Sequence, residues 1–296
     1  MPSTRLPDET HRVLTRLETY ASFVRFSHSV FALPFALVGA LLASRIEPLT
    51  WTRVGWIVAC MVTARSAAMG FNRLVDARFD ERNPRTEGRE LPAGRMSRRE
   101  AILFVVVSSA LFVAAAAPLG ALCFALSPVA LAIVFWYSLA KRVTPYTQLF
   151  LGLAMAVAPV GGWLAAGGRA GWEPWLLGLA IGTWVGGFDV LYACQDVEVD
   201  RRERLHSIPV RFGVPGALRI SRAMHVVTVA CLAALGWVVP LGPVYFAGVA
   251  GVAALLAWEQ SLVSADDLSQ VKRAFDLNGW VGIFYMVTTA AAIYLP

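Results

Sequence analysis

Apolar segments about as long as a membrane is thick recur along most of this chain, and they limit its fold more than any other feature. A helix needs about 20 mostly apolar residues to cross the hydrocarbon core of a bilayer. The chain has 296 residues, of which 57% are hydrophobic and only 16% are charged, against a charged share of roughly 25% in soluble domains. The sequence therefore predicts an all-α polytopic membrane protein.

The apolar runs predict about nine transmembrane helices. The expected spans are 22–44, 54–72, 101–117, 120–140, 148–166, 175–195, 214–239, 243–264 and 274–295. They make 1–296 a single transmembrane domain with no separate soluble domain. Residues 1–20 carry six charged side chains and no apolar core, so they are not a cleavable signal peptide. We expect them to form an amphipathic N-terminal arm on the membrane surface.

Basic residues concentrate in alternate connections between the spans. Eight arginines lie in 73–99 and four in 201–211, whereas 117–121 and 239–243 have no basic residue. Cytoplasmic connections are the ones enriched in Lys and Arg. The N-terminus and the even-numbered connections are therefore expected inside, and nine spans put the C-terminus outside. The expected location is a bacterial cytoplasmic (inner) membrane. Because the basic patches alternate with spans, they suit the lipid bilayer or an anionic substrate, and no nucleic acid partner is expected.

Two acidic ladders follow the second and sixth spans. The first ladder is Asn72, Asp76 and Asp80; the second is Tyr192, Asp196 and Asp200, with Asp189 just upstream. A step of four residues keeps side chains on one face of a helix, so each ladder directs its oxygen atoms to one place. Asp76 and Asp196 lie 120 residues apart at equivalent spans. This spacing indicates two similar four-helix halves and a ninth helix around a central cavity.

The ladders suit a site for hard cations and a phosphate-rich substrate. Proteins typically hold Mg²⁺ by one or two carboxylates together with substrate phosphates. Basic residues near the ladders, Arg73, Lys141, Arg201 and Arg202, would contact diphosphate oxygens. The alternative is a solvated loop with ion pairs along a helix face. Two ladders on the same side, at equivalent spans, favour the site.

Three segments, in this order and at this spacing, resemble the signatures of the UbiA superfamily of intramembrane aromatic prenyltransferases. The resemblance extends over about 20–295. The segments are Asn72–Asp80 with Asn83–Gly94, then Tyr137–Thr144 with Gln148, and last Asp189–Asp200 with His206–Gly213.

The resemblance implies Mg²⁺-dependent transfer of a polyprenyl group from polyprenyl diphosphate to an acceptor. Asn72, Asp76 and Asp80 would form the first metal–diphosphate motif. Asp196 and Asp200 would form the second, so that the four aspartates are the expected catalytic residues together with Tyr192 beside the reacting carbon. Lys141 would contact the diphosphate, and Arg73, beside the first ladder, is expected to do so from its charge. Arg85 and Arg89 in the cytoplasmic loop, and His206 and Ser207 in the second loop, would either close over the site or remain solvated loop residues.

The start of the first span bears on the acceptor. Phe23–Phe35 resembles the 4-hydroxybenzoate polyprenyltransferase-like branch, which serves ubiquinone biosynthesis. The stretches 28–35 and 205–209 are more like a sister group that prenylates a dihydroxynaphthoate in the futalosine pathway to menaquinone. Either acceptor is an electron-rich phenolic ring with a carboxylate. Arg25 would pair with that carboxylate and His28 with a hydroxyl, unless Arg25 snorkels to headgroups and His28 makes a structural hydrogen bond.

Two other classes of membrane protein use intramembrane acids. A CDP-alcohol phosphotransferase would concentrate its aspartates in one region, whereas this chain separates them by 120 residues. A secondary transporter would place carboxylates near the middle of the bilayer, on helices broken by Gly or Pro. Here the acids lie at one membrane face, which favours the enzyme.

Overall fold

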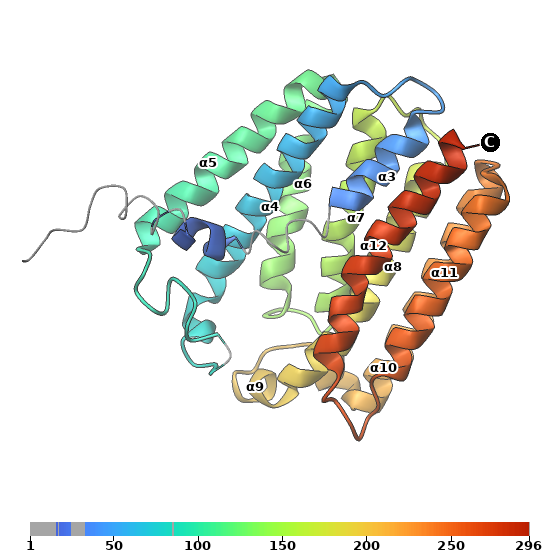
Figure 1. The fold of residues 1–296 in the computed structure, drawn as a ribbon. Helices are drawn as coiled ribbons and strands as arrows, with labels where there is room; N and C mark the ends of the chain where they lie inside the picture. The colour runs from blue at the N-terminus through green and yellow to red at the C-terminus, as the bar shows by residue number, and fades with distance from the viewer. Residues whose placement is uncertain (1–15, 17, 25–32, 85, 296) are drawn as a thin grey trace, which may run out of the picture.

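The computed structural model describes residues 16, 18–24, 33–84 and 86–295, and every regular element among them is helical (Figure 1). Two single-turn 3₁₀ helices, Ala117–Leu119 and Cys194–Asp196, adjoin the α-helices. The α-helices are α3 (Leu33–Ala43), α4 (Trp51–Asp80), α5 (Arg98–Ala116), α6 (Ala121–Ala140), α7 (Thr147–Ala165), α8 (Glu173–Ala193), α9 (Val197–Arg202), α10 (Ile208–Val238), α11 (Gly242–Ser261) and α12 (Val271–Tyr294).

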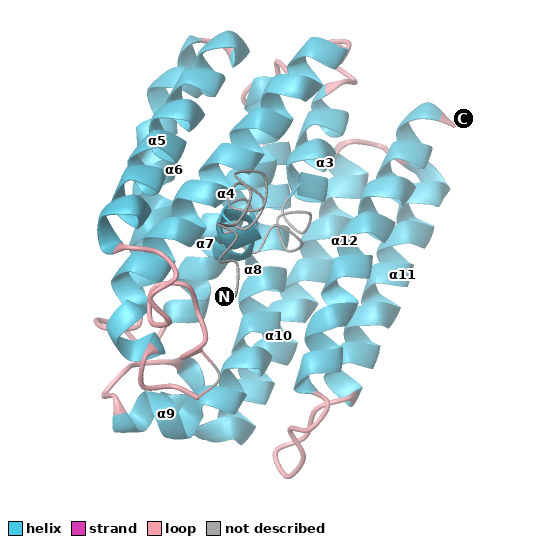
Figure 2. Cartoon of the chain, turned by 60° about the vertical axis from the view of Figure 1, so that its left-hand side comes forward, coloured by secondary structure: helices cyan, strands magenta, loops and turns pink. Residues whose placement is uncertain are grey.

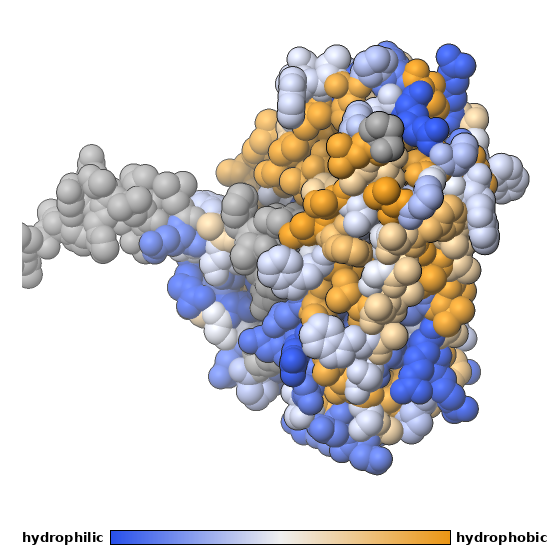
Figure 3. All heavy atoms as spheres, turned by 45° about the vertical axis from the view of Figure 1, so that its right-hand side comes forward, coloured by the Kyte–Doolittle hydropathy of each residue, from blue (hydrophilic) through white to orange (hydrophobic). Residues whose placement is uncertain are grey.

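Eight of the described helices are long and apolar enough to cross a membrane. The shorter apolar helix α3 has 11 residues and forms the second part of the predicted first span. Residues 25–32 of that span lie outside the described part. The all-α polytopic prediction is confirmed, and its count of about nine helices agrees with these elements. On the face in Figure 3, hydrophobic residues cover most of the helices and hydrophilic residues gather toward the lower end.

The helices pack in two groups, α4–α6 and α7–α12 together with α3, which meet mainly where α6 packs against α7. In the first group α4 packs against α5, and in the second α8 packs against both α7 and α10. Helix α12 closes the bundle by packing against α3 and α11. The largest apolar core lies mainly among α3, α7, α8 and α10–α12, where Trp163, Trp184 and Tyr285 are at most 2% exposed. Each of the ladder helices, α4 and α8, packs against its own partners. Both helices run toward the same end of the bundle (Figure 2).

Glycines let α3 and α7 approach closely. A Cβ atom at Gly162 would overlap the backbone carbonyl oxygen of Ala36, and one at Gly39 would overlap that of Pro159. Small residues at a helix crossing allow backbones to come together in membrane proteins. The close contact between α3 and α7 therefore depends on these positions.

The Gly162→Ala variant should unfold more readily than the wild type. The added methyl group forces α3 away from α7, and overpacking of this kind typically costs about 1–3 kcal/mol. Gly161→Ala is the matched control, because no atom lies within 4 Å of a Cβ built there. It should be neutral or slightly stabilising, since Ala favours a helix by about 1 kcal/mol over Gly. Thermal unfolding in detergent measures the stability of both variants. Equal unfolding midpoints for Gly162→Ala and Gly161→Ala would contradict the close contact between α3 and α7.

Candidate active site

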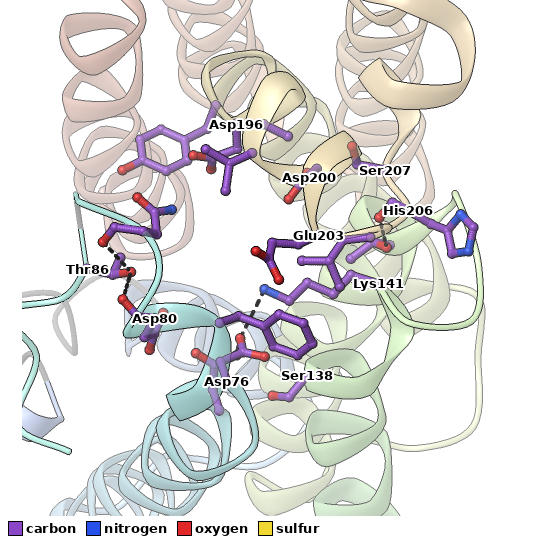
Figure 4. Close-up of a pocket in the computed structure, with 18 of the residues that line it drawn as sticks. Asp76, Asp80, Thr86, Ser138, Lys141, Asp196, Asp200, Glu203, His206 and Ser207 are labelled. Atoms are coloured by element: carbon purple, nitrogen blue, oxygen red, sulfur yellow. Dashed lines mark hydrogen bonds and ion pairs between the residues drawn. The ribbon is translucent and has the colours of Figure 1, made fainter. Parts of the chain in front are cut away.

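A cavity of about 210 Å³ lies at the end of the bundle where the longest loops are. The end of α4, the end of α6 and the segment from α8 through α9 form its walls. Both acidic ladders line it, from opposite sides (Figure 4). The lining includes Asn72, Asp76, Asp80, Thr86, Arg89, Tyr137, Lys141, Asp189, Tyr192, Asp196, Asp200, Glu203, His206 and Ser207.

The first ladder is part of α4, which continues two turns beyond the predicted span and ends at Asp80. Asp76 is only 4% exposed, and basic groups approach both of its oxygens. Lys141 Nζ lies 3.2 Å from Oδ2, and Arg142 Nη2 lies 2.8 Å from Oδ1. Asn72 also donates to Oδ2, at 3.2 Å. A buried carboxylate is tolerated when it is paired and hydrogen-bonded in this way.

Asp80 is paired by a residue of the loop between α4 and α5. Arg89 Nη1 donates to both carboxylate oxygens of Asp80, at 2.7 and 2.8 Å. The hydroxyl of Thr86 donates to the backbone carbonyl of Asp80, at 3.1 Å. Arg89 is therefore folded over the first ladder and lines the cavity.

The second ladder occupies the facing wall. Asp189 and Tyr192 lie on the last turns of α8, and Asp196 and Asp200 follow on the 3₁₀ turn and α9. The ring of Tyr192 lies against Phe275 of α12, with centroids 4.8 Å apart. The α8 helix ends at Ala193 and not at the predicted residue 195, so the ladder crosses a break between two helices.

The loop after the second ladder is attached to the turn between α6 and α7. The amide of His206 donates to the carbonyl of Lys141 at 2.7 Å, and Thr147 Oγ1 donates to the carbonyl of His206 at 3.2 Å. Gln148 accepts the amide hydrogen of Ile208 at 3.2 Å. These contacts bring the third sequence segment, around Lys141, next to the second ladder.

Acidic side chains outnumber basic ones around the cavity. Among the described residues, six carboxylates line it, namely Asp76, Asp80, Asp189, Asp196, Asp200 and Glu203, against two basic side chains, Arg89 and Lys141. Two like charges 4 Å apart repel by about 4 kcal/mol at an effective dielectric of 20. Such a cavity attracts cations and, by itself, repels a diphosphate.

The donor set fits Mg²⁺ held jointly with a phosphate ligand. All the ladder side chains present hard oxygen donors, which Mg²⁺ prefers over nitrogen and sulfur. Within the described ranges, no three His, Cys, Asp or Glu side chains are close enough together to hold a metal alone. Asp76 and Asp80 on one wall, and Asp196 and Asp200 on the other, would each supply part of a shell that substrate oxygens complete.

Some predicted residues lie elsewhere. Arg73 is 4% exposed on α4 and is not part of the cavity lining, because it is rotated away from the ladder face. Arg201 and Arg202 are exposed on α9 and do not line the cavity. Arg25 and His28, predicted to bind the acceptor, lie outside the described residues, as does Arg85.

Three residues near the site were not predicted to act there. Arg142 holds Asp76 and also donates to the backbone carbonyls of Val75, at 2.7 Å, and Ser138, at 3.1 Å. Glu203 lines the cavity and pairs with Arg82 of the opposite loop at 3.1 Å. Arg65 lies within α4, and its buried Nε has no hydrogen-bond partner among the described residues.

The sequence did carry a signal for two of these residues. Glu203 follows Asp200 by three positions and so continues the face of the second ladder. Arg65 precedes Asn72 by seven positions, two helical turns, on the face of the first ladder. An arginine inside an apolar span is costly and usually functional. The pairing of Arg142 depends on how α4 and α6 meet, which helical periodicity does not describe.

Comparison with known proteins assigns the chain to a family. The profile of the UbiA prenyltransferase family matches residues 32–287. The chain belongs to the UbiA prenyltransferase family. It is accordingly a membrane prenyltransferase, and the resemblance noted in its three segments is confirmed.

Curated relatives of this UbiA-family protein are similar over most of their length. The 4-hydroxybenzoate octaprenyltransferase of Cronobacter sakazakii is 30% identical over 239 residues, which is 79% of this chain and 82% of the relative. That of Alkalilimnicola ehrlichii is 34% identical over 218 residues, 74% of each chain.

Solved structures share the fold. The apo structure of a UbiA homolog from Aeropyrum pernix K1 has a TM-score of 0.82 and 36% identity, and covers 88% of this chain and 96% of the homolog. A UbiA homolog from Archaeoglobus fulgidus, solved bound to DMAPP and Mg²⁺, has a TM-score of 0.72 at 18% identity, covering 94% of this chain and 100% of the homolog. The fold of this chain is therefore that of the family.

Proposed function

We propose that this UbiA-family enzyme transfers a polyprenyl group from polyprenyl diphosphate to an aromatic hydroxy-carboxylate of the 4-hydroxybenzoate type, in quinone biosynthesis, and that the transfer depends on Mg²⁺. The observation that carries the proposal is the charge of the cavity. Its lining has six carboxylates and two Lys or Arg side chains, so a diphosphate enters favourably only together with cations. Two relatives of known name, both called 4-hydroxybenzoate octaprenyltransferase, support the acceptor class.

At the donor end, the two ladders bind the diphosphate from opposite walls. Asp76, Asp80, Asp196 and Asp200 would hold Mg²⁺ together with its oxygens, and Asn72 would support Asp76. When bound, Mg²⁺ supplies the positive charge that helps the diphosphate leave. Lys141 and Arg89 already reach the ladder carboxylates at 3.2 and 2.7 Å, and they are placed to turn toward diphosphate oxygens in the same cavity.

At the acceptor end, Arg65 is the described side chain best suited to bind a carboxylate. It lies about 10 Å deeper in the bundle than Asn72, given a rise of about 1.5 Å per residue. Its buried Nε is a donor in an apolar part of α4 that has no hydrogen-bond partner among the described residues. An aromatic acid bound there would direct its ring toward the diphosphate site.

The reaction is an electrophilic aromatic substitution. The allylic C–O bond of the donor breaks and its electron pair leaves with the diphosphate. The ring carbon beside the hydroxyl forms the new C–C bond, and the proton on that carbon then leaves to water or diphosphate. The ring of Tyr192, packed on Phe275, presents an aromatic face in the cavity that would stabilise the allylic cation.

The second candidate acceptor is a dihydroxynaphthoate, favoured by the sequence at 28–35 and 205–209. Both acceptors are phenolic ring systems that carry a carboxylate, so Arg65 would serve either. The concentration of arginines in alternate connections supports a cavity on the cytoplasmic side of a bacterial inner membrane, with the N-terminus inside and the C-terminus outside. Soluble acceptors of either kind would then reach the site from the cytoplasm.

Removal of Mg²⁺ should abolish product formation. Purified protein in lipid nanodiscs is given labelled polyprenyl diphosphate and either 4-hydroxybenzoate or a dihydroxynaphthoate, with Mg²⁺ or with excess EDTA. We expect product only with Mg²⁺, because the cavity is too negative for the diphosphate alone. The acceptor with the larger kcat/KM in direct competition is the physiological class. Activity that persists in EDTA, or transport of either substrate without product, would contradict the proposal.

A further inference from the structure

Residues 22–24, predicted as the start of the first span, continue the helix that ends the N-terminal arm, so we define the arm as ending at residue 24. This end of the arm packs against the back of the loop between α4 and α5. Residues 18–23 are helical, and in Figure 1 this dark-blue segment lies beside α4 and the lower part of α5. Phe23 is completely buried, in a cluster with Met96 and Ala101. Tyr20 and Phe23 both contact the ring of Phe104, each with centroids 5.7 Å apart. The arm is thus a packed part of the fold at this point.

The loop contributes a buried carboxylate to this contact. Glu90 is 3% exposed, and Ser22 Oγ donates to its Oε1 at 2.5 Å. Arg95 Nη2 lies 4.0 Å from the same oxygen, too far for a hydrogen bond. A buried carboxylate is costly unless hydrogen bonds satisfy it. Among the described side chains, Ser22 therefore makes the direct hydrogen bond from the arm to Glu90.

Arg89, the residue before Glu90 in the loop, faces the opposite side of the loop, toward the cavity. Arg89 lines the cavity and donates to both oxygens of Asp80, whereas Glu90 faces the arm. Backbone hydrogen bonds hold the loop around these two residues. The amide of Arg89 donates to the carbonyl of Thr86, and the amides of Arg95 and Met96 donate to the carbonyl of Glu90. A shift of Glu90 away from the arm would therefore move Arg89 away from the first ladder.

We propose that Ser22 and Glu90 are positioning residues for donor binding, through which the N-terminal arm holds Arg89 over the diphosphate site. This inference rests on the proposed function, because it assumes that Arg89 binds the donor diphosphate. The hydroxyl of Ser22 donates to one oxygen of the Glu90 carboxylate, and the loop then presents Arg89 to Asp80 and to the bound diphosphate. Displacements of about 1 Å in such groups are enough to weaken a site substantially.

The test measures the Kd of geranyl thiolodiphosphate, an unreactive donor analogue, with full-length protein in nanodiscs and Mg²⁺. Ser22→Ala should raise this Kd about tenfold, the equivalent of one charge-assisted hydrogen bond. Ser22→Thr keeps the hydroxyl and should restore the wild-type Kd. Glu87→Gln is the matched control, since it removes an exposed carboxylate from the same loop and should change nothing.

A double-mutant cycle separates positioning from general loosening of the fold. In an Arg89→Gln background, Ser22→Ala should have no further effect on the Kd, because the arm acts through Arg89. The same tenfold rise in both backgrounds, or no rise in either, would overturn the inference. If the wild type does not bind the analogue in Mg²⁺ at all, the proposed function fails first, whatever Ser22 does.

Discussion

Replacement of either Asp76 or Asp196 by Asn should reduce kcat/KM on the order of a thousandfold, which corresponds to about 4 kcal/mol of transition-state stabilisation. The two aspartates lie on opposite walls of one cavity, so each is expected to hold a different part of the Mg²⁺–diphosphate complex. Asn keeps the shape of the side chain and removes the negative charge that a divalent cation needs. The aspartates on one wall cannot replace a carboxylate charge that is lost from the other wall.

Steady-state kinetics with saturating acceptor and varied Mg²⁺ checks this prediction. Asp266→Asn is the control, because Asp266 is an exposed acid in the loop between α11 and α12 and does not line the cavity. Since Asp76 is buried between Lys141 and Arg142, thermal unfolding should accompany the kinetics of Asp76→Asn. Near-wild-type turnover in a folded Asp76→Asn or Asp196→Asn protein would remove the basis for the donor site.

The ladders show how much of the site could be predicted from the sequence. A spacing of four residues places side chains on one helical face, and equivalent spans bring two such faces to one end of a bundle. That is enough to predict that Asp76 and Asp196 share a cavity. It does not predict which cation pairs with which carboxylate. Arg89 reaches Asp80 only because the loop folds back, and loop conformation has no simple period in the sequence.

The predicted spans also agree with the observed helices in some places and differ from them in others. Apolar runs predicted α5, α6 and α7 closely, because lipid contact demands uninterrupted hydrophobicity there. They underestimated α4, which continues to Asp80, since its last two turns leave the apolar region but keep their helical hydrogen bonds. Arg65 lies within the predicted span 54–72, where it is a polar residue among many apolar ones, and the apolar pattern predicts no role for it. Only its position on the ladder face distinguishes it from a chance polar substitution.

Replacement of Arg65 by Gln should raise the KM for the aromatic acceptor between about 10- and 100-fold, the range expected when a hydrogen bond to a charged group is lost. The KM for the polyprenyl diphosphate should change little, because Arg65 lies two turns of α4 away from Asn72 and the donor site. Arg65→Lys should recover part of the loss, since it keeps the charge without the planar fork of donors.

The acceptor itself supplies the sharper test. The wild type should prefer 4-hydroxybenzoate to 4-hydroxybenzamide, which lacks the negative charge, and Arg65→Gln should lose most of that preference. Arg53→Gln is the matched control, because it removes the same charge from the opposite end of α4, where Arg53 pairs with Glu47 at 3.0 Å. If Arg65→Gln slows both acceptors equally, Arg65 supports the structure of α4 and the carboxylate is bound elsewhere, with Arg25 the remaining predicted partner.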